Sequence, residues 1–457
     1  MTFNIKTFLN EKRIVLVGCG REGISTYRFI RSILPELPLT LADQDLKLKE
    51  KYPDFLADPK LDFNLGPHYL LGLNKYDLII KTPGVSFKDL TKQPQREKIS
   101  SQTDLFLRMF SKQVTGITGT KGKSTTSSLI KHIADKSNEN NILVGNIGIP
   151  PFDMLDHINE DTIIIYELSS HQLQYITVAP HISILLNLYE EHLDHYKSFM
   201  EYQLAKLNIA LYQQAGDHFI YNHDDENIKL LLEKYPVPGI KHPVSILKPI
   251  ENGAWSDDTS LYTATNGRQH FYDIKDIQFL LGRHNIFNIL AAVLASKYNK
   301  IPLPFIQQGI SDFKGLEHRI EYVGDFHGIR YYNDSISTIP QATIAALETL
   351  KEVDTLILGG YDRGIDYDIL IGYLVTSPVR NIIFIGDAGF RIYNMLLSIK
   401  REDHNLLLAA DYDMVAKLAR EYTRPGSICL LSPAAASYDM FKNFEERGKV
   451  FKEKISA

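Results

Sequence analysis

The sequence has little of several features that mark particular classes of protein. Cys19 and Cys429 are its only cysteines, too few for a disulfide framework or a cysteine-based metal site. Asp and Glu total 55 against 50 Lys and Arg, a net charge of −5, which argues against nucleic acid as a main partner. No apolar run approaches the roughly 18 residues of a membrane helix, and no basic segment followed by an apolar one opens the chain. We expect a soluble cytoplasmic protein without a membrane partner.

The 457 residues are enough for about three domains. Apolar, strand-like runs alternate with helix-like segments throughout, a pattern that predicts α/β domains with parallel sheets. We predict boundaries at residues 1–110, 111–312 and 313–457. The expected order is a Rossmann-like N-terminal domain, a central P-loop ATPase-like parallel-sheet domain, and a C-terminal Rossmann-like domain.

A glycine-rich turn at residues 116–125 lies between a short apolar run and a helix-like segment. Backbone N–H groups and the helix dipole would converge there on phosphate groups. Lys123 would reach the terminal phosphates, and Ser124 or Thr125 would hold Mg²⁺. The generic P-loop pattern places its first glycine where this chain has Ile117, so the loop is a variant. The alternative is a strand-to-helix turn that binds nothing.

A second glycine motif follows the first strand-like run, at Gly18-Cys-Gly20-Arg-Glu-Gly23. The next predicted strand, 39–42, ends at Asp43, and a third runs into Thr82-Pro-Gly84. A glycine motif with an acid about 20 residues on is the dinucleotide-binding fingerprint, which alone would indicate an NAD site. A tight turn in any doubly wound domain is the other interpretation.

Polar residues follow several predicted strands of the central domain. Asn146, Glu167, His192 and Asp194 each come at or after such a strand. Ligands of parallel sheets lie at the carboxyl ends of strands, so Glu167, His192 and Asp194 are predicted to face the phosphates. Glu167 suits Mg²⁺, which takes one or two carboxylates together with phosphates. Glu167 could instead pair with a nearby base, and His192 could be an ordinary hydrogen-bonded loop residue. Residues 216–280 show no sign of a site.

Three further polar residues have ordinary explanations from spacing alone. Lys206 lies in a helix-like segment, 198–214, where a lysine is usually a solvated surface group. Asn285 and Asn288 open an apolar helix, so they could cap it or contact a base or sugar.

Together the motifs resemble the Mur ligase family, the ATP-dependent enzymes that build the peptide stem of bacterial cell-wall precursors. Thr118-Gly-Thr-Lys-Gly-Lys-Ser-Thr125 is that family's form of the P-loop, and Gly282-x-His-Asn-x-x-Asn288 and Gly315-Leu-x-His-Arg319 match its later motifs. Glu167-Leu-Ser-Ser-His-Gln-Leu173, Asn333-Asp-Ser335 and the segment 432–444 are similar to the branch that adds glutamate to UDP-N-acetylmuramoyl-L-alanine.

The resemblance implies a role for each matched residue. The substrates would be ATP, UDP-N-acetylmuramoyl-L-alanine and glutamate, joined through an acyl phosphate, with two Mg²⁺ ions as cofactors and a monomeric enzyme. ATP would be bound by Thr118, Gly119, Thr120, Lys121, Gly122, Lys123, Ser124, Thr125, Asn285, Asn288, Arg319 and Asp334. Ser124, Glu167, His192 and a carbamylated Lys206 would hold metal, with Lys123, His192 and Lys206 catalytic. The UDP-sugar would contact Gly18, Gly20, Arg21, Asp43, Thr82, Gly84 and Asn146, and glutamate would contact Thr338, Arg363, Ser437, Tyr438 and Phe444.

The expected glutamate pocket departs from the family pattern. Ile336 stands where a lysine is common, and Arg363 replaces another lysine. An arginine can still grip a carboxylate, and in a more directional way. The segments 334–338 and 359–364 resemble a smaller branch that adds L-glutamate, whereas the C-terminal segment resembles the D-glutamate majority. We favour D-glutamate because its branch is far commoner, with L-glutamate as the alternative.

Three other functions compete with this one. Folylpolyglutamate synthetase shares the P-loop variant but lacks a separate domain of the kind that precedes it here. A nucleotide-sensing, non-catalytic protein on a ligase scaffold would be expected to lose Lys123, Glu167, His192 or Lys206. An NAD-dependent dehydrogenase rests on residues 18–43 alone.

Overall fold

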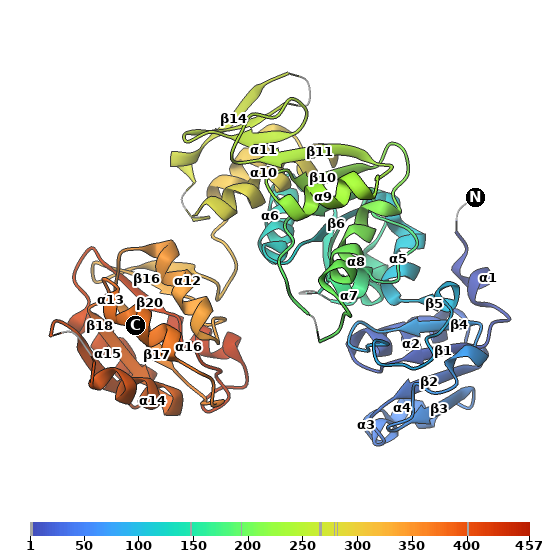
Figure 1. Ribbon diagram of the computed structural model, residues 1–457, viewed down its shortest axis with the longest axis horizontal. Helices are drawn as coiled ribbons and strands as arrows, with labels where there is room; N and C mark the ends of the chain where they lie inside the picture. The colour runs from blue at the N-terminus through green and yellow to red at the C-terminus, as the bar shows by residue number, and fades with distance from the viewer. Residues whose placement is uncertain are drawn as a thin grey trace. The chain divides into compact units, whose positions relative to one another are not determined.

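The computed structural model describes residues 3–146, 149–192, 194–264, 267–277, 279–280, 282–399 and 402–457, without the side chain of His284. The chain forms two compact units (Figure 1). Unit 1 comprises residues 1–276 and 283–311, and unit 2 comprises residues 277–282 and 312–457. Each unit is described by itself.

Unit 1 begins with a five-stranded parallel sheet in the order β3-β2-β1-β4-β5. The strands are β1 (Ile14–Val17), β2 (Leu39–Asp43), β3 (Leu61–Leu65), β4 (Leu78–Lys81) and β5 (Ile99–Ser100). The helices are α1 (Ile5–Leu9), α2 (Arg21–Ile33), α3 (Leu48–Lys51), α4 (Pro53–Leu56) and α5 (Gln102–Phe110). Strands β1 and β4 are buried throughout, as expected for parallel strands covered on both faces. This strand order is the Rossmann order, as predicted.

The central sheet of unit 1 has the order β14-β13-β12-β11-β10-β9-β6-β8-β7. Its strands are β6 (Val114–Thr118), β7 (Asn141–Gly145), β8 (Ile163–Glu167), β9 (Ile182–Leu185), β10 (His218–Asn222), β11 (Ile240–Ser245), β12 (Ala254–Ser256), β13 (Ser260–Thr263) and β14 (Gln269–Asp273). Its helices are α6 (Lys123–Lys136), α7 (Ser170–Leu173), α8 (Phe199–Leu211), α9 (Glu226–Lys234), α10 (Arg283–Tyr298) and α11 (Leu303–Asp312). Strands β6 to β12 pair in parallel and β12 to β14 antiparallel, so residues after β6 to β10 share one edge.

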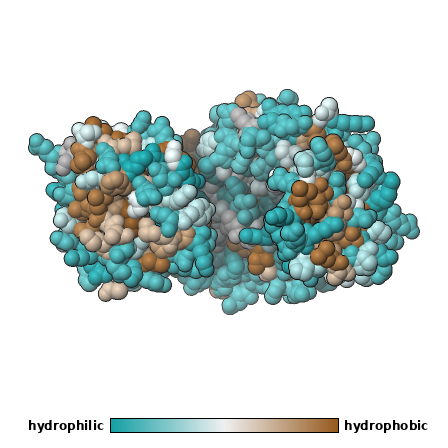
Figure 2. Space-filling model, turned by 90° about the horizontal axis from the view of Figure 1, so that it is seen from below, coloured by the Kyte–Doolittle hydropathy of each residue, from teal (hydrophilic) through white to brown (hydrophobic). Residues whose placement is uncertain are grey.

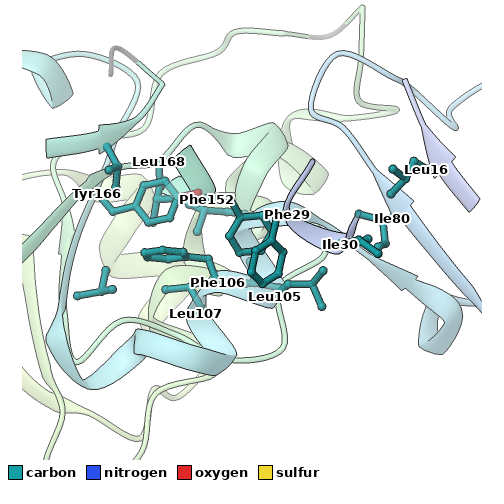
Figure 3. Packing of buried hydrophobic residues seen from close by; sticks show 14 of the residues in the cluster. Leu16, Phe29, Ile30, Ile80, Leu105, Phe106, Leu107, Phe152, Tyr166 and Leu168 are labelled. Carbon is teal, nitrogen blue, oxygen red and sulfur yellow. The ribbon is translucent and has the colours of Figure 1, made fainter. Parts of the chain in front are cut away.

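Aromatic side chains join the two sheets of unit 1 through one hydrophobic core (Figure 3). Phe29 of α2 stacks on Phe152 with ring centroids 4.0 Å apart. Phe106 of α5 meets Tyr166 of β8 edge to face at 5.8 Å. Buried aromatic pairs of this kind stabilise beyond their burial alone. The glycine turns that follow β1 and β6 therefore belong to one packed body.

Unit 2 has a six-stranded sheet in the order β15-β16-β20-β17-β18-β19, parallel except for β15. The strands are β15 (Glu321–Phe326), β16 (Ile329–Asn333), β17 (Val353–Gly359), β18 (Asn381–Ile385), β19 (Asn405–Ala409) and β20 (Ile428–Leu431). The helices are α12 (Pro340–Leu350), α13 (Asp368–Thr376), α14 (Gly386–Leu397), α15 (Tyr412–Tyr422) and α16 (Phe444–Ser456). Residues of α12 to α14 share one core cluster and those of α15 and α16 another, so helices cover both faces of the sheet.

The predicted three-domain α/β fold is confirmed. The predicted boundaries at residues 110 and 312 stay a prediction. None of the helices in the described part of the chain combines the length and apolar composition needed to cross a membrane. The face drawn in Figure 2 is mostly hydrophilic, with apolar side chains in separate patches.

Candidate active site

The turn between β6 and α6 has the geometry of a phosphate-binding loop. It carries Thr118 to Gly122, and Lys123, Ser124 and Thr125 form the first turn of α6. Lys123 Nζ donates to the carbonyls of Gly119 and Thr120, each at 2.9 Å. Gly122 has φ +87°, a left-handed conformation that disfavours other residues. The N-terminus of α6 therefore faces the loop, as a phosphate site requires.

Asn187, just after β9, clamps this loop from the neighbouring strand. Its backbone carbonyl accepts from the Thr120 N–H at 3.0 Å. Its side chain accepts from the Lys121 N–H at 2.8 Å and donates to the Lys121 carbonyl at 3.0 Å. Sequence reasoning missed this residue, although its position after a parallel strand was a usable signal.

A cavity of about 280 Å³ opens beside the loop, walled by residues distant in sequence. It is lined by Lys121, Gly122, Asn187, Tyr189, Asn222, Asp224, Ile246, Leu247, Phe287 and Asn288. Apolar walls with a few polar groups are typical of sites for small molecules and cofactors. Residues 216–280, in which the sequence indicated no site, therefore contribute to the wall of this cavity. Four of the lining residues come from that segment, because β10 ends at the same sheet edge as the P-loop.

Asp224 shapes this cavity by holding the turn that follows β11. Its carboxylate accepts from Ser245 Oγ and from the Ile246 N–H, each at 2.7 Å. Both bonds fix the cavity wall formed by Ile246 and Leu247.

The two predicted asparagines of α10 lie next to the P-loop. Asn288 is buried and donates to Asn285 Oδ1 at 3.1 Å. A Cβ on Gly122 would lie 2.6 Å from Asn288 Oδ1, so the two residues are in close contact. The structure thus brings Asn285 and Asn288 to the loop.

Glu167 ends β8 and is completely buried. Asn146 Nδ2 donates to Glu167 Oε1 at 2.9 Å, and Ser127 Oγ of α6 lies 3.4 Å from Oε2. These are weak, neutral partners for a buried carboxylate, which is costly without a cation. Among the described residues Glu167 forms no hydrogen bond to a basic side chain, although its charge acts on Lys206, and a divalent cation would supply the missing charge.

The residues around Glu167 fit Mg²⁺ bound together with phosphates. Within the described residues, no three His, Cys, Asp or Glu side chains cluster as a complete metal site. Mg²⁺ rarely uses such an all-protein cage and is bound by one or two carboxylates, a hydroxyl, waters and phosphate oxygens. Glu167 and Ser124, on adjoining elements, could supply the protein part of that set.

Lys206 is buried beneath the P-loop, at 2% exposure, so the surface-lysine interpretation is wrong. Its Nζ donates to the Gly119 carbonyl at 2.8 Å and lies 3.5 Å from Thr118 Oγ1. Burial lowers the pKa of the Lys206 amine well below its usual value, and the charge of Lys123 lowers it further. Lys206 is therefore suited to be a neutral amine.

His192 lies in the loop after β9 with φ +59°, an uncommon conformation for a non-glycine residue. Its ring is 4.9 Å from that of His171, which in turn is 4.1 Å from the ring of His195. Burial lowers the pKa of His171 to about 3 and that of His195 to about 4, so both are neutral near pH 7. Sequence reasoning assigned no role to His171, although it lies in the matched segment 167–173, or to His195.

The first glycine turn is held by the residues predicted to contact a nucleotide. Asp43 Oδ2 accepts from the Cys19 N–H at 2.6 Å, and Oδ1 accepts from the Asp45 N–H at 2.9 Å. Thr82 Oγ1 donates to the Val17 carbonyl at 3.1 Å. Asp43 and Thr82 thus bracket the turn that contains Gly18, Gly20 and Arg21. Gly84 is exposed just beyond Thr82, at the same sheet edge.

Buried charged groups link this turn to the central domain. Glu22 of α2 accepts from Gln172 Nε2 of α7 at 2.6 Å. Lys81, 2% exposed at the end of β4, interacts electrostatically with Glu22. Burial raises the pKa of Glu22 to about 7 and lowers the pKa of Lys81 to about 8. Sequence reasoning missed this pair, because Glu22 is a variable position of the glycine motif and Lys81 belongs to no motif.

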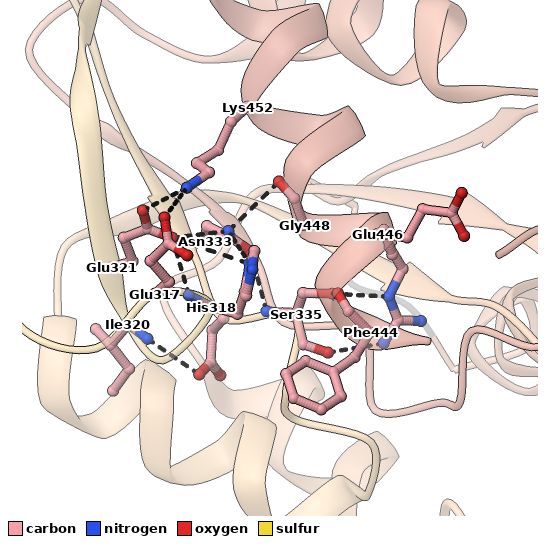
Figure 4. A network of polar contacts seen from close by, with 12 residues as sticks. Glu317, His318, Ile320, Glu321, Asn333, Ser335, Phe444, Glu446, Gly448 and Lys452 are labelled. Carbon is pink, nitrogen blue, oxygen red and sulfur yellow. Dashed lines mark hydrogen bonds and ion pairs between the residues drawn. The ribbon is translucent and has the colours of Figure 1, made fainter. Parts of the chain in front are cut away.

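In unit 2, a polar network fixes the segment that carries Arg319 and Asp334 (Figure 4). Asn333 Nδ2 contacts His318 Nδ1 at 2.9 Å and donates to Glu321 Oε2 at 3.0 Å. Asp334 accepts from the Ile320 N–H at 3.1 Å and from Ser432 Oγ at 2.8 Å. Burial raises the pKa of Asp334 to about 6. Arg319 is exposed, and the ATP contacts predicted for Arg319 and Asp334 stay predictions.

The residues predicted to bind glutamate gather at the carboxyl edge of the unit 2 sheet. Arg363 Nη2 donates to the Thr338 carbonyl at 2.8 Å, so these two segments are adjacent. Ser437 is buried, whereas Tyr438 is exposed. Phe444 begins α16 and its carbonyl accepts from Ser335 Oγ at 2.8 Å.

Comparison with known proteins gives a consistent result. A family model described as the Mur ligase middle domain matches residues 117–296. A protein of Thermoanaerobacter sp. (strain X514) named UDP-N-acetylmuramoylalanine--D-glutamate ligase is 33% identical over 453 residues, which cover 98% of this chain and 99% of the relative. A protein of Clostridium botulinum (strain Hall) with the same name is 33% identical over 464 residues, covering 99% and 98%.

Solved structures show the same fold at lower identity. A UDP-N-acetylmuramate-alanine ligase from Thermotoga maritima matches with a TM-score of 0.57 and 17% identity, covering 98% of this chain and 99% of that one. A MurF ligase from Thermotoga maritima in complex with ADP matches with a TM-score of 0.55 and 14% identity, covering 92% and 96%.

Proposed function

The chain belongs to the Mur ligase family and is an ATP-dependent amino acid ligase; we propose that it joins D-glutamate to UDP-N-acetylmuramoyl-L-alanine in peptidoglycan precursor synthesis. The observation that carries the choice of substrates is the full-length likeness, at 33% identity, to relatives named for D-glutamate addition. The dehydrogenase and folylpolyglutamate synthetase hypotheses are set aside by it. The non-catalytic hypothesis is set aside as well, since Lys123, Glu167, His192 and Lys206 are all present.

The proposed reaction has two steps. The alanine carboxylate takes the γ-phosphoryl group of ATP, which leaves ADP and an acyl phosphate. The amino group of glutamate then attacks the acyl carbon, loses a proton and displaces phosphate, so that an amide forms. No enzyme nucleophile is required, and positioning with charge neutralisation supplies most of the catalysis.

Residues of the P-loop would perform the first step. Lys123, already oriented toward the loop carbonyls of Gly119 and Thr120, would offer its charge to the transferring phosphoryl group. Ser124 and Glu167 would hold one Mg²⁺ ion, and His192 would help to hold a second. When bound, Mg²⁺ neutralises developing phosphate charge. Asn285, Asn288 and the cavity lined by Leu247 would hold the rest of ATP.

Carbamylation of Lys206 is part of the proposal. A neutral amine is the form that reacts with CO₂, and the lowered pKa of Lys206 makes this form available. The product is an anion at a position where a second lysine, Lys123, lies nearby. A carbamate would therefore serve as a metal ligand where an ammonium would repel the metal.

The first glycine turn would hold the UDP part of the sugar substrate. Gly18, Gly20 and Arg21 lie on that turn, Asp43 and Thr82 bracket it, and Gly84 and Asn146 are exposed at the carboxyl edges of their sheets. Asn146 also donates to Glu167, which links the sugar site with the metal site. In unit 2, Thr338, Arg363, Ser437, Tyr438 and Phe444 would bind glutamate.

We also propose that the enzyme is a cytoplasmic monomer with domain boundaries near residues 110 and 312. ATP and UDP-linked sugars are cytoplasmic metabolites, which supports the proposed location.

The test is a product assay with the D and L isomers of glutamate supplied separately. We expect ADP release to require both UDP-N-acetylmuramoyl-L-alanine and glutamate, with kcat/KM at least about 100-fold higher for D-glutamate. A preference for L-glutamate would overturn the assigned isomer and point to Ile336 and Arg363. Turnover of NAD(H) without the UDP-sugar would contradict the proposal altogether.

A further inference from the structure

Arg447 of α16 is the largest fully buried side chain of the described residues, at 1% exposure. Buried arginines are usually paired with a carboxylate. Its hydrogen-bond partners here are main-chain carbonyls and one hydroxyl. Burying a guanidinium at this position costs solvation energy. The presence of Arg447 here therefore needs an explanation beyond the packing of α16.

The guanidinium binds three loops at once. Nη2 donates to the carbonyls of Ser335 at 2.8 Å and Ala435 at 3.0 Å. Nη1 donates to the carbonyl of Ala436 at 3.1 Å and lies 3.4 Å from that of Gly359. Nε donates to Ser335 Oγ at 3.0 Å. The planar, five-donor fork of arginine is suited to such convergent binding, and lysine is not.

These loops follow β16, β17 and β20, which are neighbours in the order β16-β20-β17. Each bound residue lies within a few positions of a residue in the proposed glutamate pocket. Ser335 precedes Thr338, Gly359 precedes Arg363, and Ala436 adjoins Ser437. Arg447 therefore fixes the backbone on which the pocket side chains stand.

A glycine at position 360 permits the close approach of these loops. Gly360 has φ +135°, and a Cβ there would lie 2.3 Å from the Ala436 carbonyl and 2.9 Å from Arg447 Nη1. The same Ser335 side chain that receives Arg447 Nε donates to the Phe444 carbonyl, so the start of α16 is tied in as well (Figure 4).

We infer that Arg447 is the positioning residue of the amino-acid pocket: it sets the spacing of the loops after β16, β17 and β20 and so determines the affinity for the incoming amino acid. The inference rests on the proposed function, because it takes glutamate as the ligand of this edge. Arg447 acts through the loops and does not itself contact the ligand.

The test compares Arg447→Met with a matched control, Arg424→Met. Methionine keeps much of the apolar stem but leaves the carbonyls of Ser335 and Ala435 without the donor they have here, and that of Ala436 with only the Tyr361 N–H. Arg424 also lies in unit 2 and donates through Nε to the buried Asp354 at 2.9 Å, but near the opposite end of β17. Both changes destabilise unit 2, but only one alters the carboxyl edge of the sheet.

We expect Arg447→Met to raise the KM for glutamate at least about tenfold, since small misplacements of binding groups have large effects. The KM values for ATP and the UDP-sugar should change less than about twofold. Arg424→Met should lower the active fraction, and so the apparent kcat, without changing the KM for glutamate. A merely structural role would give Arg447→Met this same pattern, which would overturn the inference.

Two further measurements keep the outcome decisive. Arg447→Lys retains the buried cation but can donate to fewer carbonyls. Its KM for glutamate should therefore lie between those of the wild type and Arg447→Met. A wild-type KM for Arg447→Lys would overturn the inference, even if Arg447→Met does not fold. Hydrogen exchange on the complete protein should be faster in residues 335–338, 359–364 and 434–438 of the Arg447 variants only. If hydrogen exchange in the Arg447 variants equals that of the wild type, the inference is contradicted, whatever the turnover. If the wild-type enzyme is inactive with glutamate, only the proposed function is contradicted.

Discussion

At the scale of single residues, Lys206 is the position where burial most changes the chemistry. An amine that is buried at 2% exposure and held by the Gly119 carbonyl has lost the solvation that keeps ordinary lysines charged. Its helix, α8, gives no sign of this in the sequence, because a lysine in a helical segment is usually exposed. The family resemblance identified the residue, and burial gives the physical reason.

The first prediction is that Lys206→Ala lowers kcat at least about 100-fold, because a metal ligand is lost. A small carboxylate such as formate or acetate should restore part of the activity by occupying the space left by the side chain. Lys131→Ala is the control, since Lys131 is an outward-facing residue of α6 paired with Asp135. A fully active Lys206→Ala enzyme would remove Lys206 from the site.

Glu22 gives a second residue-scale prediction, this one on stability and pH. Burial raises its pKa from 4.5 to about 7, so the folded state binds a proton that the unfolded state has released between these values. The free energy of unfolding therefore falls as pH rises from about 4.5 to 7. Each unit of pKa shift corresponds to about 1.4 kcal/mol, so the fall is about 3 kcal/mol at most. Lys81, whose pKa is lowered to about 8, contributes only at higher pH.

Glu22→Gln should remove this part of the pH dependence. The amide can still accept from Gln172 Nε2 but does not titrate. Urea unfolding at pH 5, 6 and 7 should show a smaller decline for Glu22→Gln than for the wild type. Glu226→Gln, at the exposed start of α9, should keep the full decline. Identical slopes in all three proteins would show that Glu22 is already ionised in the folded state.

At the scale of elements, the sequence predicts features formed by residues that are close together in the chain. It misses features whose residues come together only in the folded structure. The glycine turns after β1 and β6 were predicted because strand, turn and helix signals occur within a few residues of one another. The cavity wall was missed because Asn222 and Asp224, at the end of β10, and Leu247, after β11, meet the P-loop only through the sheet order β11-β10-β9-β6. Arg447 was missed for the same reason, since a charged residue in a charged helix is normally exposed.

The turn after β11 carries the third prediction. Asp224→Ala removes both hydrogen bonds that hold Ser245 and Ile246, so the cavity wall should loosen. The KM for ATP should then rise about tenfold. This corresponds to roughly 1.4 kcal/mol of binding free energy, as expected for the loss of one or two such bonds. The KM values for the UDP-sugar and glutamate should not change.

Asp257→Ala is the matched control for this element. Asp257 also fastens a turn of the same sheet, accepting from the N–H groups of Thr259 and Ser260, but it does not line the cavity. If both variants raise the KM for ATP equally, the effect is one of general stability and the cavity is not the nucleotide site.

At the scale of the whole molecule, the predicted site residues form two groups, one within each compact unit. The P-loop, Glu167, Lys206 and the cavity are all contained in unit 1, together with the first glycine turn. The glutamate-pocket residues belong to unit 2. The sequence predicted three α/β domains because each part has its own alternation of strands and helices, and the boundaries at residues 110 and 312 stay a prediction. The exact residues at which one unit gives way to the other could not be predicted, since residues 277–282 belong to unit 2 and residues 283–311 to unit 1.

This division predicts how the protein responds to a nucleotide in calorimetry. If the units unfold separately, Mg-ATP without other substrates should raise the transition of unit 1, because the cavity and the P-loop belong to it. At a concentration of 100 times the Kd the stabilisation is about 2.7 kcal/mol, a shift of several degrees at this size. Arg424→Met identifies the other transition, since it breaks an ion pair within unit 2 and should lower that transition alone. Mg-ATP could instead shift only the unit 2 transition, which is the one that Arg424→Met lowers. That result would place the main nucleotide contacts in unit 2 and contradict the assignment of the cavity beside Gly122 to ATP.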